Sequence, residues 1–268
     1  MNMLTAWPEN VPIGKDGYQT IDGTFPRTTA VLKVLGMSKE GLINWAATEE
    51  RKAVLEAAKI VYANDAIGRG PLETAVIMDE DEFISAVGSA LGSVKAHAKQ
   101  MNRAADIGTE IHQAIQSRVR AMIDQRIFVP TPLRDEVQWA VDHFEEWWTD
   151  TGLKAVRTEQ AVWDKDLGYA GTIDLIAEHP RLGLGVVDFK TGKSVYDEAH
   201  IQVAAYMHAG SRWADLRWGQ IVRLPKVVGD PKFEMVPLGS CYKRHLDREQ
   251  LMEVFRAALT IHKHMVAK

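Results

Sequence analysis

The sequence predicts an α/β protein in which helices pack against a sheet and a helical region precedes it. Helix-type spacing of apolar residues dominates residues 1–150, whereas strand-type alternation begins at about residue 155. Helical stretches then return between and after the predicted strands, an order typical of α/β proteins. We therefore expect a helical N-terminal elaboration over residues 1–105 and an α/β core over residues 106–268.

In the first region, a short helix capped by Thr28 or Thr29 is predicted after an opening segment rich in turn residues. Longer helices are predicted over about 42–62 and 79–124, where Ala and other helix formers are frequent. A further helix is predicted over about 133–149. One face of that helix carries Val137, Val141, Phe144 and Trp148.

In the second region, three consecutive strands are predicted over 155–163, 169–177 and 185–189, separated by the turns DKDLG and HPRLG. Their close succession predicts an antiparallel meander. A helix over about 197–213 follows. The remaining predicted elements are strands over 220–224 and 232–238 and a final helix over about 244–264.

Composition limits the function classes. Residues 1–150 contain 15 Lys and Arg against 22 Asp and Glu, whereas residues 151–268 contain 17 against 14, a weak basic excess in the core. Cys241 is the single cysteine, which excludes an internal disulfide and a four-cysteine iron–sulfur cluster. The sequence contains no run of about 18 apolar residues and no signal-peptide pattern. We therefore expect a soluble, intracellular, cytoplasmic protein with no membrane partner.

The stretch GYAGTIDLIAEHPRLGLGVVDFKTGK carries the candidate chemistry. Asp174 lies within an apolar strand, where a carboxylate is unfavourable unless it is paired or binds a cation. Asp188 and Lys190 end the next strand, and alternation puts them on one face. If the strands are neighbours, the carboxylates and the backbone carbonyl of Phe189 can hold Mg²⁺ or Mn²⁺. Lys190 can position or deprotonate a water and offset charge on a phosphate, which suits phosphodiester hydrolysis.

An isolated Asp-x-Lys triplet occurs by chance in many proteins and is weak evidence for a site. The further candidate site residues are also weak evidence when each is taken alone. Gln202 and Tyr206 share one face of a predicted helix, where Tyr is more often a core residue; beside the site, the pair can hold a phosphate or brace the lysine strand. His112 lies on a helix, where a lone histidine is more often packed than a ligand. Glu159 precedes the hairpin, where an isolated Glu usually faces water, but it can be a third acidic group.

Taken in order, GT-x-x-H, E-x-x-V, GTID, DFKTG and Q-x-x-x-Y resemble the RecB-like branch of the PD-(D/E)XK nuclease superfamily over about residues 106–210. The resemblance implies a restriction-endonuclease-like mixed-sheet core flanked by helices. It implies that His112, Asp174 and Asp188 hold the metal and that Lys190 serves catalysis. The remaining matches to the branch's motifs are Glu159 in the first core strand and Gln202 and Tyr206 in the helix.

The segments FPRTTAVLKVLG and LINWA resemble the leading helical region of viral and mitochondrial exonucleases of this branch. Arg27 and Lys33 there can contact phosphate, although solvated surface is the more common role. Several relatives carry a four-cysteine iron–sulfur cluster, which this chain cannot hold. The resemblance leaves open a virus-encoded, phage-type protein.

The expected function is that of a Mg²⁺- or Mn²⁺-dependent deoxyribonuclease, an exonuclease acting on single strands or DNA ends. Recombination, repair or replication proteins are the partners this branch suggests, and the motifs predict no oligomeric state. Two alternatives stay open: a non-catalytic DNA-binding module on the same fold, against which the complete acid-acid-lysine set argues, and a structure-specific endonuclease or resolvase. Candidate base-stacking side chains, most of them expected in the core, are Trp147, Trp148, Trp163, Trp213 and Trp218.

Overall fold

The computed structural model describes residues 6–36, 39–67, 80–91, 96–230, 233–241 and 244–266. The chain divides into two compact units: unit 1 comprises Met1–Gly36 and Ile107–Lys268, and unit 2 comprises Met37–Asp106. The boundary falls inside one long helix, α4 (Ala96–Ile123), one residue from the predicted boundary. The opening 36 residues differ from the prediction, because they group with the sheet-bearing unit.

Unit 1 is built on a mixed five-stranded sheet in the order β4-β5-β6-β7-β8. Its strands are β4 (Lys154–Asp164), β5 (Tyr169–His179), β6 (Gly183–Lys190), β7 (Trp218–Arg223) and β8 (Glu234–Pro237). The predicted β4–β5–β6 meander is antiparallel, β7 runs parallel to β6, and β8 returns antiparallel to β7. A parallel pair needs a long crossover, which α6 (Asp197–Gly210) provides between β6 and β7.

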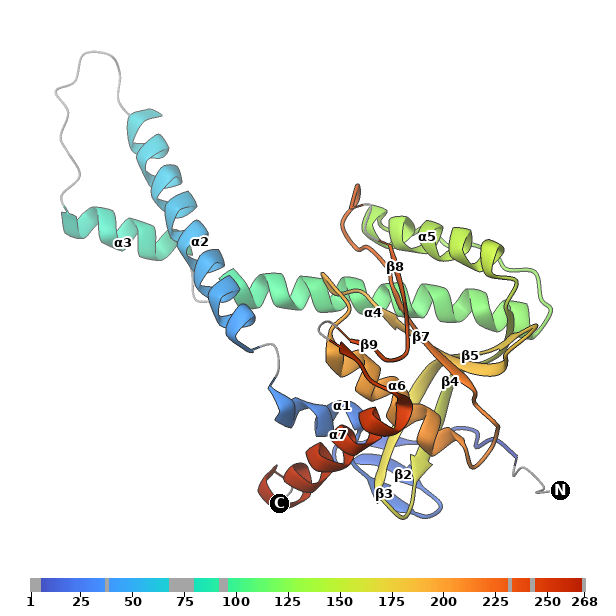
Figure 1. Ribbon diagram of the computed structural model, residues 1–268. Coiled ribbons are helices and arrows are strands. Elements are labelled where there is room, and N and C mark those ends of the chain that lie inside the picture. The colour runs from blue at the N-terminus through green and yellow to red at the C-terminus, as the bar shows by residue number, and fades with distance from the viewer. Residues whose placement is uncertain are drawn as a thin grey trace. The chain divides into compact units, whose positions relative to one another are not determined.

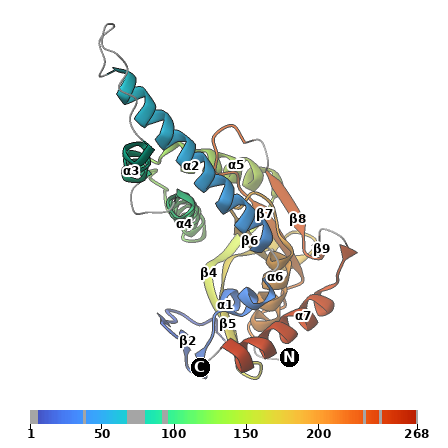
Figure 2. The same cartoon turned by 90° about the vertical axis from the view of Figure 1, so that its left-hand side faces the viewer.

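Helices cover both faces of this sheet, as Figures 1 and 2 show. One face packs against α5 (Asp135–Thr151) and residues 107–123 of α4, in a core that includes Phe144, Val187 and Phe189. The other face packs against α1 (Thr28–Leu32), α6 and α7 (Arg248–Ile261), in a core that includes Val186 and Ile221. Neighbouring residues of β6 thus enter opposite cores, as expected of a strand buried on both faces. The predicted α/β class is confirmed.

The opening segment contains a small sheet that the sequence analysis did not predict. β1 (Ile13–Gly14), β2 (Gly17–Thr20) and β3 (Gly23–Phe25) pair antiparallel in the order β1-β2-β3. Strands of two to four residues are too short for alternation to reveal them. Gly17 is required here: its φ is +130°, and a Cβ would lie 2.0 Å from the Phe25 carbonyl oxygen.

Thr28 starts α1 but does not cap it, so the predicted cap is wrong. The N-cap residue is Arg27, which makes no side-chain cap. The Thr28 hydroxyl is buried and donates instead to the Ala170 carbonyl of β5, at 2.9 Å. This bond attaches the N-terminal part of unit 1 to the central sheet. A 3-10 turn, Lys33–Leu35, follows α1.

The C-terminal helix begins later than predicted. β9 (Ser240–Cys241) and β10 (Arg244–His245) pair first, and α7 starts only after Asp247. Asp247 accepts from the Gln250 backbone N–H, and the Gln250 side chain accepts from the Asp247 N–H, a capping box that fixes this start. A π-helical turn, His262–Val266, follows α7.

Unit 2 contains α2 (Lys39–Ile67), α3 (Glu80–Leu91) and the first part of α4. Its buried cluster consists of Ala57, Val61 and Val87. The Gln100 amide donates to the Glu49 carboxylate, which also pairs with Lys52. Among the helices that the structure describes, none is both long enough and apolar enough to cross a membrane.

The core beneath β6 gives a first prediction. Phe144 is fully buried and meets Phe189 edge-on, with ring centroids 5.7 Å apart. We expect Phe144→Ala to lower the free energy of unfolding by about 3–5 kcal/mol, because it removes apolar contacts and leaves a cavity. Urea denaturation measures this change. Ile127→Ala, at a side chain 93% exposed, is the control and should change stability by less than about 0.5 kcal/mol; equal losses would contradict this packing.

Candidate active site

The candidate site lies where β5 and β6 separate. Their ladder runs from His179↔Gly183 to Leu175↔Val187. Beyond that pair, the Phe189 backbone N–H donates to Asp174 Oδ2 at 2.8 Å, so a side chain replaces the neighbouring strand as acceptor. β5 continues to pair with β4 there, whereas β6 continues to pair with β7. The strands of Asp174 and Asp188 are thus neighbours, as the predicted convergence requires.

Three side chains from three elements meet at the β5 side of this opening. His112 of α4 places Nδ1 3.7 Å from Asp174 Oδ2. One ligand atom each from His112, Glu159 and Asp174 lie within 4.8 Å of one another. An imidazole nitrogen and carboxylate oxygens are donors that Mg²⁺ or Mn²⁺ accepts. We call these three residues the acidic cluster.

Glu159 reaches the acidic cluster through an unusual backbone. Its φ is +50° inside β4, between the paired positions Thr158↔Leu175 and Gln160↔Ile173. A non-glycine residue in this region is unfavourable by about 1–3 kcal/mol, and such strain is typical of functional sites. Thr158 Oγ1 donates to the Asp174 carbonyl at 2.9 Å, which ties the two strands together beside this kink.

The pKa of Glu159 is raised to about 7. The residue is exposed overall, but protein atoms crowd its carboxylate, and the resulting loss of hydration is the largest cause. The negative charge of Asp174 raises the pKa further, whereas Arg120 lowers it. Two carboxylates this close without a cation repel each other, which favours a bound positive ion.

Asp188 is buried at the end of β6, with 1% of its side chain exposed. Lys190 Nζ lies 2.6 Å from Asp188 Oδ2, an ion pair that compensates the buried carboxylate. Burial raises the pKa of Asp188 and the Lys190 charge opposes this shift. Burial lowers the pKa of Lys190, but Asp188 and Asp174 outweigh it, so its pKa is raised and the lysine stays charged.

Gln202 of α6 connects the ion pair to Tyr206. Its Oε1 accepts from Lys190 Nζ at 3.2 Å, while its Nε2 donates to Asp188 Oδ1 at 3.3 Å and to the Tyr206 hydroxyl at 2.7 Å. Gln202 thus contacts the lysine strand, as a brace would, and a role of the pair in holding a phosphate stays a prediction. Tyr206 itself is buried, 4% exposed.

Two glycines of the predicted motifs allow this packing. A Cβ on Gly171 would lie 2.2 Å from a ring carbon of Tyr206, so only glycine lets α6 approach β5 this closely. A Cβ on Gly108 would lie 2.9 Å from Thr191 Oγ1, so the absence of a side chain at Gly108 lets α4 pack against the loop after Lys190. The glycines of GTID and GT-x-x-H therefore set the distances between the elements that carry the site.

The structure groups the predicted metal ligands differently from the sequence. His112 and Asp174 come together with Glu159, which was a weaker candidate, whereas Asp188 is held by Lys190. The Phe189 N–H is bound by Asp174, and a role for its carbonyl stays a prediction. The imidazole nitrogen and carboxylate oxygens of the acidic cluster fit a divalent ion.

The other candidates lie elsewhere. Arg27 and Lys33 are exposed. Of the five tryptophans, three are buried in the two cores and offer no stacking face: Trp147, Trp163 and Trp213. Trp148 and Trp218 are partly buried.

Sequence reasoning missed two supporting residues. Tyr18 of β2 shares a hydrogen bond with Thr172 Oγ1, at 2.7 Å, on the strand of Asp174. Arg223 of β7 is buried, donates to the Gly192 carbonyl at 2.8 Å and pairs with Asp230 at 2.9 Å. It thus holds the loop that follows Lys190. An arginine within the apolar run IVRL was the available signal.

The sequence matches no protein-family model and no curated protein. Among solved structures, one titled "Crystal structure of SSO0001" is similar over 58% of this chain and 72% of that chain, at 11% identity and a TM-score of 0.27. At this TM-score the likeness carries no argument about fold or function.

The raised pKa of Glu159 predicts a pH dependence of stability. Because the folded pKa, about 7, exceeds the usual value of 4.5, the folded state binds more protons between these pH values. The metal-free protein should therefore lose stability as pH rises from about 5 to 8, and Glu159→Gln should lose less. Urea denaturation with a chelator at both pH values measures this. Glu253→Gln, exposed on α7, should follow wild type; equal slopes for wild type and Glu159→Gln would refute the assignment.

The ion pair predicts an effect of Lys190 on metal affinity. Lys190 competes with a cation for Asp188, so Lys190→Ala should bind Mn²⁺ more tightly, by roughly tenfold, or about 1.4 kcal/mol. Asp174→Ala should bind it more weakly, since it removes a ligand. Titration followed by electron paramagnetic resonance of free Mn²⁺ gives the affinities. Lys193→Ala, an exposed lysine in the next loop, is the matched control; unchanged or weaker binding by Lys190→Ala would show that the lysine does not compete.

Proposed function

We propose that this chain is a Mg²⁺- or Mn²⁺-dependent deoxyribonuclease that hydrolyses phosphodiester bonds. The observation that carries the proposal is the convergence of Asp174, Asp188 and Lys190 where β5 and β6 separate, with His112 and Glu159 beside Asp174. Three acidic groups of different burial, a histidine and a charged lysine form a set that suits attack on a phosphate diester.

The fold is compatible with a restriction-endonuclease-like core of the PD-(D/E)XK superfamily. An antiparallel meander, a crossover helix and a parallel fourth strand form a mixed sheet flanked by helices, which supports this part of the proposal. We extend the proposal to an exonuclease of the RecB-like branch, acting on single strands or DNA ends.

The acidic cluster would hold the metal ion, with Asp188 as a further carboxylate of the site. A bound divalent ion supplies positive charge beside the scissile phosphate and lowers the pKa of a nearby water. Lys190, kept charged by its acidic neighbours, offsets the negative charge that builds on the phosphate. Gln202, itself held by Tyr206, limits the positions of the lysine amine.

Cleavage of labelled linear DNA in the presence of Mn²⁺ tests the proposal. Wild type should degrade it, and Asp188→Ala and Lys190→Ala should each lower the rate by about 10²-fold or more, because each removes transition-state stabilisation. Asp166→Ala, at an exposed aspartate in the turn after β4, is the control and should keep full activity. Undiminished cleavage by either site variant would refute the site.

A closed single-stranded circle separates the alternatives. An exonuclease leaves the circle intact while linear strands disappear, whereas cutting of the circle indicates an endonuclease or resolvase. If wild type binds DNA but does not cleave it with Mn²⁺ or Mg²⁺ present, the nuclease proposal is refuted in favour of the DNA-binding module.

A further inference from the structure

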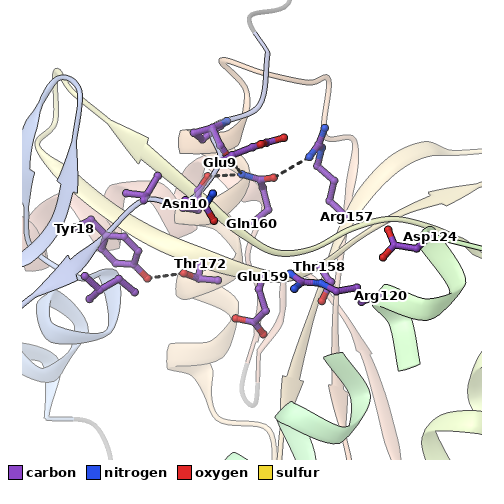
Figure 3. A pocket seen from close by; sticks show the side chains of 14 residues that line it. Glu9, Asn10, Tyr18, Arg120, Asp124, Arg157, Thr158, Glu159, Gln160 and Thr172 are labelled. Atoms are coloured by element: carbon purple, nitrogen blue, oxygen red, sulfur yellow. Dashed lines mark hydrogen bonds between the residues drawn. The ribbon is translucent and has the colours of Figure 1, made fainter. Parts of the chain in front are cut away.

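A polar pocket adjoins the acidic cluster on the β4 side of unit 1 (Figure 3). Its volume is about 520 Å³. Residues 157–161 of β4 form its floor, the N-terminal segment 8–13 forms one wall, and the end of α4, with Arg120 and Asp124, forms another. Glu159 belongs both to this pocket and to the acidic cluster, so the two are continuous. None of the predicted roles uses this pocket.

The N-terminal wall is fixed to the sheet. Gln160 is buried, and its Nε2 donates to the Pro8 carbonyl at 2.9 Å. Its Oε1 accepts from Arg157 at 3.4 Å, and Figure 3 shows both bonds. The far end of the segment is held by the pairing of Ile13 with Tyr18. The wall is therefore preformed, which lowers the entropy that binding a ligand against it must overcome.

The pocket offers two arginines to an anion, and a cation at the acidic cluster would lower its negative charge. Arg120 and Arg157 contribute two positive charges, and Glu9, Asp124 and Glu159 contribute three negative ones. A cation at the acidic cluster offsets the charge of Glu159. Two positive charges then face two negative ones, so an anion would be held by the charged N–H donors of Arg120 and Arg157, which phosphate prefers, and not by net charge.

Arg120 is placed to hold a phosphate near the reacting one. It follows His112 by eight residues on α4, a little over two helical turns. Arg120 and Glu159 line the same pocket, which places the arginine near the acidic cluster. Arg157 lies further along β4, beside Gln160, with Trp7 5.8 Å from its guanidinium carbon. A path of donors thus leads from the cluster into the pocket.

We propose that this pocket binds the terminal nucleotide of a DNA strand, with its phosphate at Arg120 and its nucleoside between Arg157 and the N-terminal wall. Asn10 and Tyr18, which also line the pocket, supply a polar group and a ring for that nucleoside. The volume suits a nucleotide, since pockets for small ligands span about 300–1,000 Å³. In this proposal the N-terminal wall ends the path of the strand, so that the site takes ends. This inference rests on the proposed nuclease function.

Calorimetric titration with thymidine 5′-monophosphate, thymidine 3′-monophosphate and inorganic phosphate, each with Mn²⁺, tests the pocket without measuring cleavage. At least one nucleotide should bind more tightly than phosphate, and the tighter one identifies the end that is held. Arg120→Gln and Arg157→Gln should each weaken that binding by roughly tenfold, the loss of a charge-assisted bond of about 1.4 kcal/mol. Arg181→Gln, exposed in the turn after β5, is the matched control and should bind as wild type does.

Nucleotide affinity equal to that of phosphate, or unchanged in both pocket variants, would overturn the inference. If the protein cleaves DNA but fails this titration, the pocket inference is refuted and the nuclease proposal stands. If nucleotide binding depends on Arg120 but the protein cuts no DNA, the pocket inference stands and the nuclease proposal is refuted.

The wall has a separate test. Gln160→Ala removes the bond to Pro8, so cutting of a closed single-stranded circle should rise relative to cutting of a linear strand. Thermal melting of this variant checks that it folds, and Asp166→Ala, at an exposed residue outside the pocket, is the control and should cut the two substrates in the wild-type ratio. A circle that stays intact in a folded Gln160→Ala protein would contradict the role of the wall.

Discussion

The burial of the Asp188 carboxylate is the constraint on which the rest of the site depends. A buried charge is strongly unfavourable unless a partner compensates it, and Lys190, two residues along the same strand, supplies the opposite charge. Gln202 then satisfies the second carboxylate oxygen and the lysine together. Because Gln202 also holds Tyr206, which lies against Gly171, one carboxylate connects β6, α6 and β5.

A second carboxylate makes the opening beside this network possible. Strands that separate leave backbone N–H groups without acceptors, and such groups are costly when buried. Asp174 accepts the Phe189 N–H, so β5 and β6 can diverge without that loss. The same side chain lies next to His112 and Glu159. The residue that keeps the sheet stable at its opening is thus also the centre of the acidic cluster.

The sequence predicted the parts of this arrangement that depend on periodicity. Alternation located the three meander strands and put Asp188 and Lys190 on one face, and the four-residue spacing paired Gln202 with Tyr206. Periodicity cannot reveal a single left-handed residue, so the kink at Glu159 was not predicted, although Glu159 was a candidate third acidic group. The strands of the opening segment were too short to detect, and Thr28, a good helix cap by residue type, bonds to β5 instead.

The place of the N-terminal segment follows from the position of β4 at the edge of the five-stranded sheet. An exposed edge strand can pair with other chains, and proteins avoid this with bulges, charges or covering segments. β4 has a register shift between Ala155 and Arg157 and the kink at Glu159. The segment held by Gln160 then covers the next stretch. Glu159 thus reaches the acidic cluster, while the adjacent Gln160 binds the covering N-terminal segment. This attachment to β4 explains why residues 1–36 belong to the unit that carries the site.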